Sequence, residues 1–246
     1  MNFQNTFQQL EQPSQTYLSC YTYTGEANST FPRHCHSYYE IAYIMSGSRF
    51  ETLNNERCEV GDNTLIFIPP LTIHNLNNKT EVKDIVIQFD HKFLRNSSIL
   101  FDSKFIIRPA CNQMGIFQLG SSDEIYQILK KIYESCKIRE KATEKDTMSF
   151  DEKLCLDLDL NSLCLQLIST MIKNKMLCIE SNGASYSDML NFDPLFSEIL
   201  SNIDNPIDMH TACHMVGLSY SHFSRTFENI TGFHYTYFCN LLRIRY

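Results

Sequence analysis

Three histidines and a glutamate are spaced in the chain as metal ligands often are. His34 and His36 are separated by one residue, Glu40 follows four residues after the second histidine, and His74 lies farther along. Alternate residues of a strand point to the same face, so the first two imidazoles could converge. Three imidazoles and one carboxylate suit Fe, Mn, Ni or Zn. These residues are the candidate ligand-binding site and a candidate metal site.

A structural role for the same residues is the alternative. Histidine and glutamate side chains could simply hydrogen-bond to one another at the mouth of a barrel, and a motif match needs geometric confirmation. A catalytic metal would also need an open coordination position and a matched pocket. The sequence contains no Ser/His/Asp, Cys/His or phosphate-loop arrangement that competes with the histidines. We therefore predict a protein that is not an enzyme, with no catalytic residues and no required cofactor, and we keep a divalent metal as the less favoured alternative.

These side chains need strands to position them, and the sequence of the first third of the chain predicts such strands. Residues 16–92 contain short runs that are rich in β-branched and aromatic residues and are separated by Gly, Asn and Pro. The runs are YLSCYTYTG, EIAYIMSG, SRFETL, NTLIFIPP, TIHNLNN and VKDIVIQF. Many short strands at this spacing favour a sandwich or a barrel.

Residues 34–47 and 61–78 resemble the two signature segments of the cupin superfamily. The first reads H-x-H, three residues, E, six residues and G, and the second reads GDNTLIFIPPLTIHNLNN. The resemblance implies a small double-sheet β barrel. It also implies that metal-dependent relatives use as ligands the residues matching His34, His36, Glu40 and His74. Two positions depart from the pattern, because Asn28 and Thr72 stand where many of those proteins have glycine.

Two amphipathic helices are predicted after the strands. DEIYQILKKIYESCKIRE, which begins at Asp123, places its apolar residues on one face, and a second run from about Phe150 to Met176 has similar spacing. Wide apolar faces of this kind need a cover, which could be the β domain or the same helices of a second subunit. We predict that residues 121–177 mediate dimerisation.

The remaining residues predict a short helical domain behind a linker. Residues 180–188 are rich in Ser and poor in apolar residues, as linkers are. We expect Asp193 to cap a helix that has Pro194 at its first position. Farther along, two short helices flank the turn Gly217-Leu218-Ser219, which is the spacing of a helix-turn-helix.

The second helix of this pair has one apolar and one polar face. Phe223 and Phe227 are four residues apart and should face inward with Leu218. Ser224 and Arg225 would then lie on the outer face, as would Ser221. Arginine can donate two hydrogen bonds to a guanine edge, and serine can contact bases or phosphate.

Residues 208–246 resemble the first helix-turn-helix of AraC-type transcription regulators. The matching residues, in chain order, are Gly217, Ser219, Phe223-Ser224-Arg225, Phe227 and Gly232. The resemblance implies that Ser221, Ser224 and Arg225 read bases and that His222 contacts phosphate. Such regulators carry two helix-turn-helix units, and this sequence stops after the first. We therefore expect a truncated record of a longer protein.

Composition limits the cellular setting. The net charge is −7, from 21 basic and 28 acidic residues, so the chain as a whole does not have the charge of a nucleic-acid binder. Ten cysteines without any C-x-x-C pair are typical of free thiols in a reducing compartment. The sequence has neither the pattern of a secretory signal nor an apolar run that we expect to cross a bilayer, so we predict a cytoplasmic protein without a membrane partner.

Together these observations predict an α+β protein with a cupin double-stranded β barrel, two helices and a truncated all-α helix-turn-helix domain. The predicted units are a ligand-sensing domain, a dimerisation segment, a linker and a partial DNA-binding domain, at residues 1–120, 121–177, 178–192 and 193–246. The predicted function is a ligand-responsive, sequence-specific DNA-binding transcription regulator. Its partners would be promoter DNA, a small-molecule effector and a second copy of the chain.

Two other functions fit the sequence. One is a metal-dependent cupin oxygenase or isomerase with an appended helical domain, which loss of metal and turnover together on His74→Ala would favour. The other is a cupin dimer whose short tail only captures partners.

Overall fold

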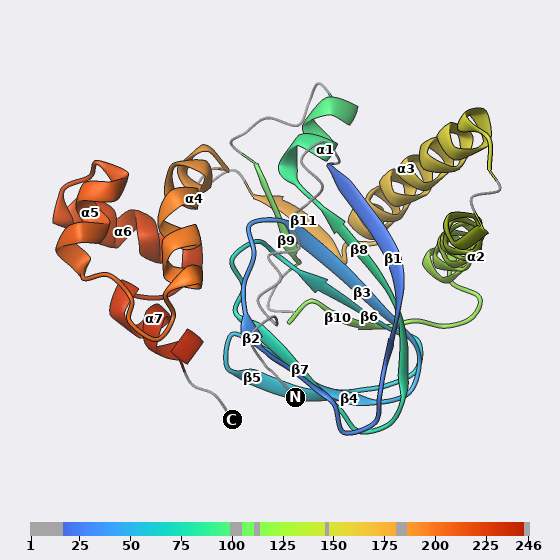
Figure 1. The fold of residues 1–246 in the computed structure, drawn as a ribbon, viewed down its shortest axis with the longest axis horizontal. Helices are drawn as coiled ribbons and strands as arrows, with labels where there is room; N and C mark the ends of the chain where they lie inside the picture. Colours follow the sequence, from blue (N-terminus) through green and yellow to red (C-terminus); the bar gives the residue numbers. More distant parts are fainter. Residues whose placement is uncertain (1–16, 99–104, 111–113, 146–147, 181–185, 244–246) are drawn as a thin grey trace.

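Two antiparallel β-sheets face each other in the first half of the chain, and helices lie on two sides of them (Figure 1). The computed structural model describes residues 17–98, 105–110, 114–145, 148–180 and 186–243. This arrangement of a two-sheet β domain followed by helices confirms the predicted α+β class.

The larger sheet has five strands in the order β1-β8-β3-β6-β10. Their bounds are β1 Leu18–Gly25, β8 Val82–Phe89, β3 Tyr39–Ser46, β6 Thr64–Ile68 and β10 Ile116–Gln118. The smaller sheet has the order β2-β7-β4-β5, with β2 Thr30–His34, β7 His74–Asn78, β4 Arg49–Leu53 and β5 Glu56–Val60. The predicted runs correspond to β1, β3, β4, β6, β7 and β8. Each of these predictions is confirmed.

Successive side chains of the central strands point to opposite faces of the larger sheet and so form two separate apolar layers. On β3, Ala42 and Ile44 pack with Ile66 and Val82 in the space between the two sheets. The intervening residues of the same strands, Ile41 among them, form a second layer on the outer face of the larger sheet. Because both faces of β3 are covered, its sequence is almost continuously apolar, as expected for a central strand.

Helices α2 (Glu124–Lys145) and α3 (Phe150–Lys173) cover that outer layer. Ser149 and Glu152 form a reciprocal capping box at the start of α3, which fixes where the helix begins. Both helices lie close to the predicted positions.

By length and composition α3 could cross a membrane, although the sequence had suggested that no segment is long enough. Within the molecule, 33% of its most apolar window is buried. The buried side chains, such as Leu160 and Leu167, pack into the same core as α2 and the sheet. The rest of that apolar window is not buried within the molecule.

The last four helices enclose a separate aromatic core. They are α4 (Tyr186–Ser201), α5 (Met209–Val216), α6 (Tyr220–Thr231) and α7 (Tyr235–Arg243). Phe192 and Phe196 of α4 contact Phe227 of α6, and Phe238 of α7 completes the cluster. Figure 1 shows this group on the side of the sheets opposite to α2 and α3.

The start of α4 differs from the sequence prediction. Asp193 does not cap the helix, because α4 begins at Tyr186 and Pro194 lies inside it. A proline removes one backbone hydrogen bond from a helix interior, but burial of Phe192 and Leu195 on the same helix stabilises it. In addition, β11 (Leu177–Glu180) pairs with β9 (Ile106–Pro109), so part of the predicted linker is a strand. Residues 181–185 of that linker lie outside the described residues.

Candidate functional site

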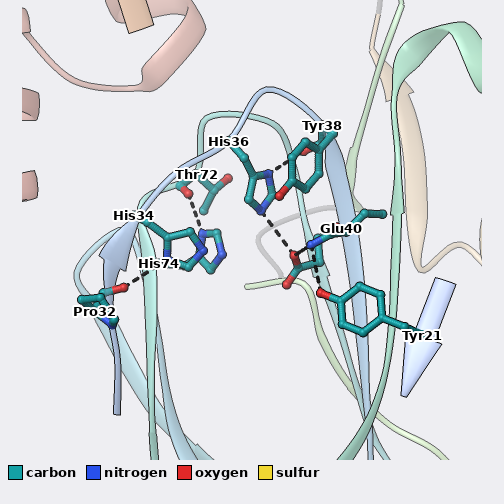
Figure 2. A network of polar contacts seen from close by, with 9 residues as sticks. Tyr21, Pro32, His34, His36, Tyr38, Glu40, Thr72 and His74 are labelled. Carbon is teal, nitrogen blue, oxygen red and sulfur yellow. Dashed lines mark hydrogen bonds and ion pairs between the residues drawn. The ribbon is translucent and has the colours of Figure 1, made fainter. Parts of the chain in front are cut away.

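The predicted ligand residues come from three neighbouring segments at one end of the barrel (Figure 2). His34 ends β2, His36 follows it, Glu40 lies in β3 and His74 begins β7. His34 and His74 are direct partners in the antiparallel pairing of β2 with β7. Strand pairing therefore brings together residues that are forty positions apart in the sequence.

The three histidines form one compact cluster. Their ring centroids are 4.0 Å apart for His34 and His74, 4.9 Å for His36 and His74, and 5.9 Å for His34 and His36. One nitrogen from each ring lies within 4.8 Å of the others. The spacing prediction that these imidazoles converge is consistent with this geometry.

Backbone carbonyls fix the tautomer of each ring. The Nδ1 atoms of His34, His36 and His74 lie 3.0, 2.9 and 2.9 Å from the carbonyl oxygens of Pro32, Tyr38 and Thr72. A carbonyl oxygen can only accept a hydrogen bond, so each Nδ1 must carry the proton. In a neutral ring the Nε2 then keeps its free lone pair, which is the form that binds metals.

Burial keeps two of these rings neutral. Removal from water lowers the pKa of His34 to about 4, and it lowers the pKa of His74 well below its ordinary value. Within the described part of the chain, the buried Nε2 of His74 has no hydrogen-bond partner. A buried acceptor without a donor is costly, and a bound cation would satisfy it. The donor set thus fits a divalent transition metal held by the three histidines.

Glu40 lies beside this cluster and contacts it through one histidine. Its Oε2 is 3.5 Å from Nε2 of His36 and accepts a 2.8 Å hydrogen bond from Nε2 of Gln88. Burial on its own raises the pKa of Glu40, but the contacts with His36 and Gln88 outweigh it and leave the pKa below its ordinary value.

A second polar cluster, which the sequence analysis missed, occupies the barrel interior. Arg49 donates from Nε to Glu51 Oε2 at 2.8 Å and from Nη1 to Asp84 Oδ2. All three side chains are at most 2% exposed. Burial raises the pKa of Glu51 to about 7 despite the neighbouring guanidinium. The sequence does contain a signal for this cluster. Arg49 and Glu51 occupy alternate positions of β4 with the buried Leu53, so all three side chains point to the inward face of the strand.

Polar atoms of both clusters are shielded from solvent. Among the described residues, Nε2 of His74 and Oδ1 of Asp84 each expose less than 1 Å² and have no hydrogen-bond partner. The histidine cluster is less enclosed at His34, which is half-buried, and at Glu40, whose side chain is 14% exposed.

The predicted DNA-contacting residues lie on one helix, α6. Ser221, His222 and Arg225 are exposed and Ser224 is half-buried, whereas Phe223 on the opposite side is fully buried. Asp208 caps α5 by accepting a hydrogen bond from the backbone N–H of Thr211. Phe223 and Phe227 of α6 are both buried, which confirms the predicted inward face of this helix.

A tight turn joins α5 to α6 at the predicted position. Gly217 has φ 72°, a left-handed conformation that glycine adopts without strain. Ser219 has the backbone conformation of an N-cap but makes no side-chain capping bond. The turn lets α6 leave α5 within three residues, as the sequence had predicted.

Residues 17–154 match the family described as AraC-like ligand binding domain. The chain belongs to this family. The matched AraC-like domain contains the whole histidine cluster, α2 and the first residues of α3. It does not extend to α4–α7. No curated protein matched the chain.

Solved structures with similarity to the AraC-like domain are distant. A conserved protein of unknown function from Streptococcus pyogenes is 17% identical, with 30% of this chain and 66% of that one covered and a TM-score of 0.30. A cupin superfamily protein from Desulfitobacterium hafniense is 12% identical, with 30% of this chain and 68% of that one covered and a TM-score of 0.29. The EutQ protein of Clostridium difficile is 20% identical, with 30% of this chain and 56% of that one covered and a TM-score of 0.27. The match spans less than two thirds of the first and third of these proteins.

One departure from the cupin pattern has a structural explanation in this AraC-like domain. Asn28, which replaces a glycine of the pattern, has φ 61°. Asparagine tolerates the left-handed region better than other residues that carry a β-carbon. The turn before β2 therefore keeps a conformation that glycine would otherwise supply.

Proposed function

We propose that this chain is a ligand-responsive, DNA-binding transcription regulator, and not an enzyme. The AraC-like domain would bind the effector, and α5 and α6 would bind promoter DNA. The observation that carries the proposal is the presence, in one chain, of a buried histidine cluster and an exposed α6 that presents Ser221, His222 and Arg225.

The ligand that we propose for the histidine cluster is a divalent transition metal ion. His34, His36 and His74 would hold it, and Glu40 would balance part of its charge through the contact with His36. In a sensor the bound ion would act as a cross-link between β2, β7 and the segment that leads into β3. The small-molecule effector expected from the sequence would then be a cation, because three converging imidazoles beside a carboxylate suit a transition metal.

Homodimerisation through α3 is the second part of the proposal. Phe150, Leu154 and Leu158 recur every four residues along α3 and are 77%, 47% and 58% exposed. Ile138 of α2 is 54% exposed as well. Residues four apart on a helix share a face, so α3 presents an apolar stripe that a second copy could bury. A cytoplasmic location remains the proposed setting.

DNA selection tests the proposal directly. The full chain, with Co²⁺ present, would be used to select sequences from a random duplex pool, and the selected duplex would then be titrated by fluorescence anisotropy. Arg225→Ala should weaken binding about 5- to 150-fold, the equivalent of about 1 to 3 kcal/mol for a bidentate base contact. Arg57→Ala, which removes an exposed arginine of β5, is the matched control and should bind as the wild type does.

A metal-dependent oxygenase or isomerase is the second candidate, and the three converging imidazoles are the observation that favours it. If the chain bound metal but enriched no DNA sequence, that candidate would replace the regulator.

A further inference from the structure

Two cysteine thiols meet where α2 packs beside β1, the edge strand of the larger sheet (Figure 1). Sγ of Cys20 in β1 lies 3.2 Å from Sγ of Cys136 in α2. The two residues are 2% and 0% exposed, and both are free cysteines. Because 116 positions separate them in the sequence, it is the packing of α2 on the sheet that brings them together.

The two sulfur atoms are close enough to form a covalent bond after a small movement. A disulfide bond is about 2.05 Å long, so the atoms need to approach by only about 1 Å. The thiol of Cys164 in α3 also interacts with Cys20. The contact of 3.2 Å between Cys20 and Cys136 favours these two as the bonding partners.

Polar contacts beside the pair hold α2 on β1. Arg139 donates a hydrogen bond to the carbonyl of Cys20, and Nζ of Lys137 donates to Oγ1 of Thr22 at 3.0 Å. Thr22, Lys137 and Arg139 are half-buried, so solvent lies next to the pair although the thiols themselves are covered. Local opening of α2 at this edge would expose both sulfur atoms.

The surroundings keep both thiols protonated. The contact with Cys136 alone would lower the pKa of Cys20, but the interaction with Cys164 and burial outweigh it and raise the pKa well above its ordinary value. The contact with Cys20 and burial also raise the pKa of Cys136. Because the thiolate is the reactive form, the pair should stay reduced under mild conditions and should react only with a strong oxidant or during local opening.

We propose that Cys20 and Cys136 form a reversible disulfide bond when the protein meets a hydroperoxide, and that this bond clamps α2 to β1. The inference is independent of the proposed metal site. In a reducing compartment, disulfides are usually transient and serve catalysis or redox sensing.

The reaction with hydrogen peroxide has two steps. One cysteine, as its thiolate, attacks a peroxide oxygen, the O–O bond breaks, and the sulfur becomes a sulfenic acid while the released hydroxide takes up the thiol proton and leaves as water. The second thiol attacks that sulfur, the S–S bond forms, and the sulfenic oxygen leaves as a second water. Two thiols thus lose two hydrogen atoms, and one peroxide molecule becomes two waters. Exchange with a low-molecular-weight thiol, which is itself oxidised, restores the reduced pair.

The bond would join two distant parts of the chain and so disfavour the unfolded state. It would also restrict the movement of α2, which packs with α3 in the core on the outer face of the larger sheet. Because α3 carries the exposed apolar stripe proposed as the dimer interface, oxidation would stiffen the helices that support this interface.

Peptide mapping of the folded full chain identifies the bond. The protein is treated with hydrogen peroxide, its remaining thiols are alkylated, and it is digested with trypsin without reduction. Trypsin releases Cys20 in residues 1–33 and Cys136 in residues 132–137, and each peptide has one cysteine. We expect a link between these two peptides at least about 5-fold more often than in chain oxidised after unfolding, because packing orients the two thiols. Dithiothreitol should release the peptides. Folded protein with both peptides alkylated, or with residues 1–33 linked to a different cysteine, would overturn the proposal.

Thermal unfolding measures the clamp. Oxidised wild type should melt at least about 5 °C higher than the same sample after dithiothreitol, and Cys136→Ser should show no such difference. Cys155→Ser, at an exposed cysteine of α3, is the matched control and should behave as the wild type does. Dithiothreitol does not reduce oxidised methionine, so the comparison within one sample isolates the disulfide. A linked wild type with an unchanged melting temperature would refute the clamp.

Discussion

At the scale of residues, backbone carbonyls decide what the histidines can do. The spacing in the sequence predicted the four ligand candidates. The structure brings His34, His36 and His74 together, and Glu40 lies beside them in contact with His36. Spacing could not predict the tautomers, because these depend on carbonyls that the fold places next to each Nδ1. The resulting lone pairs on Nε2 make a cation the best-fitting ligand.

His74→Ala should abolish metal binding at the cluster. Loss of even an outer partner of a metal ligand costs about 10- to 100-fold in affinity, so loss of a ligand should cost at least that much. Equilibrium dialysis against Zn²⁺ with elemental analysis measures the effect. His222→Ala removes an exposed histidine of α6 and should leave the bound metal unchanged. Equal metal content in the two variants would contradict the assignment.

Glu51 should make the protein less stable as the pH rises. Burial raises its pKa from 4.5 to about 7, so between these values the folded state keeps a proton that the unfolded state has lost. Stability then falls as the pH rises through this window, by roughly 3 kcal/mol in total. Glu51→Gln keeps an acceptor for Arg49 and should remove most of this fall.

Thermal unfolding at several values between pH 5 and pH 8 would measure this effect. Glu56→Gln, at an exposed carboxylate of the neighbouring strand β5, should retain the pH dependence of the wild type. A Glu51→Gln protein with the same pH profile as the wild type would show that Glu51 does not hold the proton.

At the scale of elements, the spacing of apolar residues predicted the buried central strands and the long helices, but it missed the strands at the edges of the smaller sheet. β3, β6 and β8 are mostly apolar and were predicted, as were α2 and α3. β2 contains a proline and β5 is mostly charged, so neither has the pattern of a strand. Pairing with β7 and β4 places them in the sheet instead. The predicted linker includes residues 178–180 of β11, because the pairing of β11 with β9 joins segments that are distant in sequence.

The exposed stripe of α3 should be the dimer interface. Leu154→Glu with Leu158→Glu places two charges on it and should convert a dimer into a monomer, since a buried unpaired charge is costly. Light scattering coupled to size-exclusion chromatography measures the mass. Leu190→Glu changes an exposed leucine of α4 and should leave the dimer intact. A monomeric wild type, or a dimeric double variant, would contradict this interface.

At the scale of the whole molecule, two apolar cores lie on opposite sides of the sheets (Figure 1). One core joins the sheet to α2 and α3, and the other joins Cys35, Leu71 and Ile73 to α4–α7. The sequence predicted both groups of helices but could not predict how α4–α7 pack on the barrel. Those contacts come from single residues, Cys35, Leu71 and Ile73, that lie near the histidines in the sequence. The net charge of −7 makes non-specific attraction to DNA weak, so the proposed DNA binding should depend on a small number of specific contacts from α6.

The most direct test of the whole account is the affinity of the full chain for its selected duplex, measured by anisotropy with and without Co²⁺ at a fixed salt concentration. The account predicts that Co²⁺ changes the Kd at least about 5-fold in the wild type and leaves it unchanged in His74→Ala. A wild-type Kd that stays the same while cobalt absorbance shows a filled site would contradict the claim that the histidine cluster controls DNA binding.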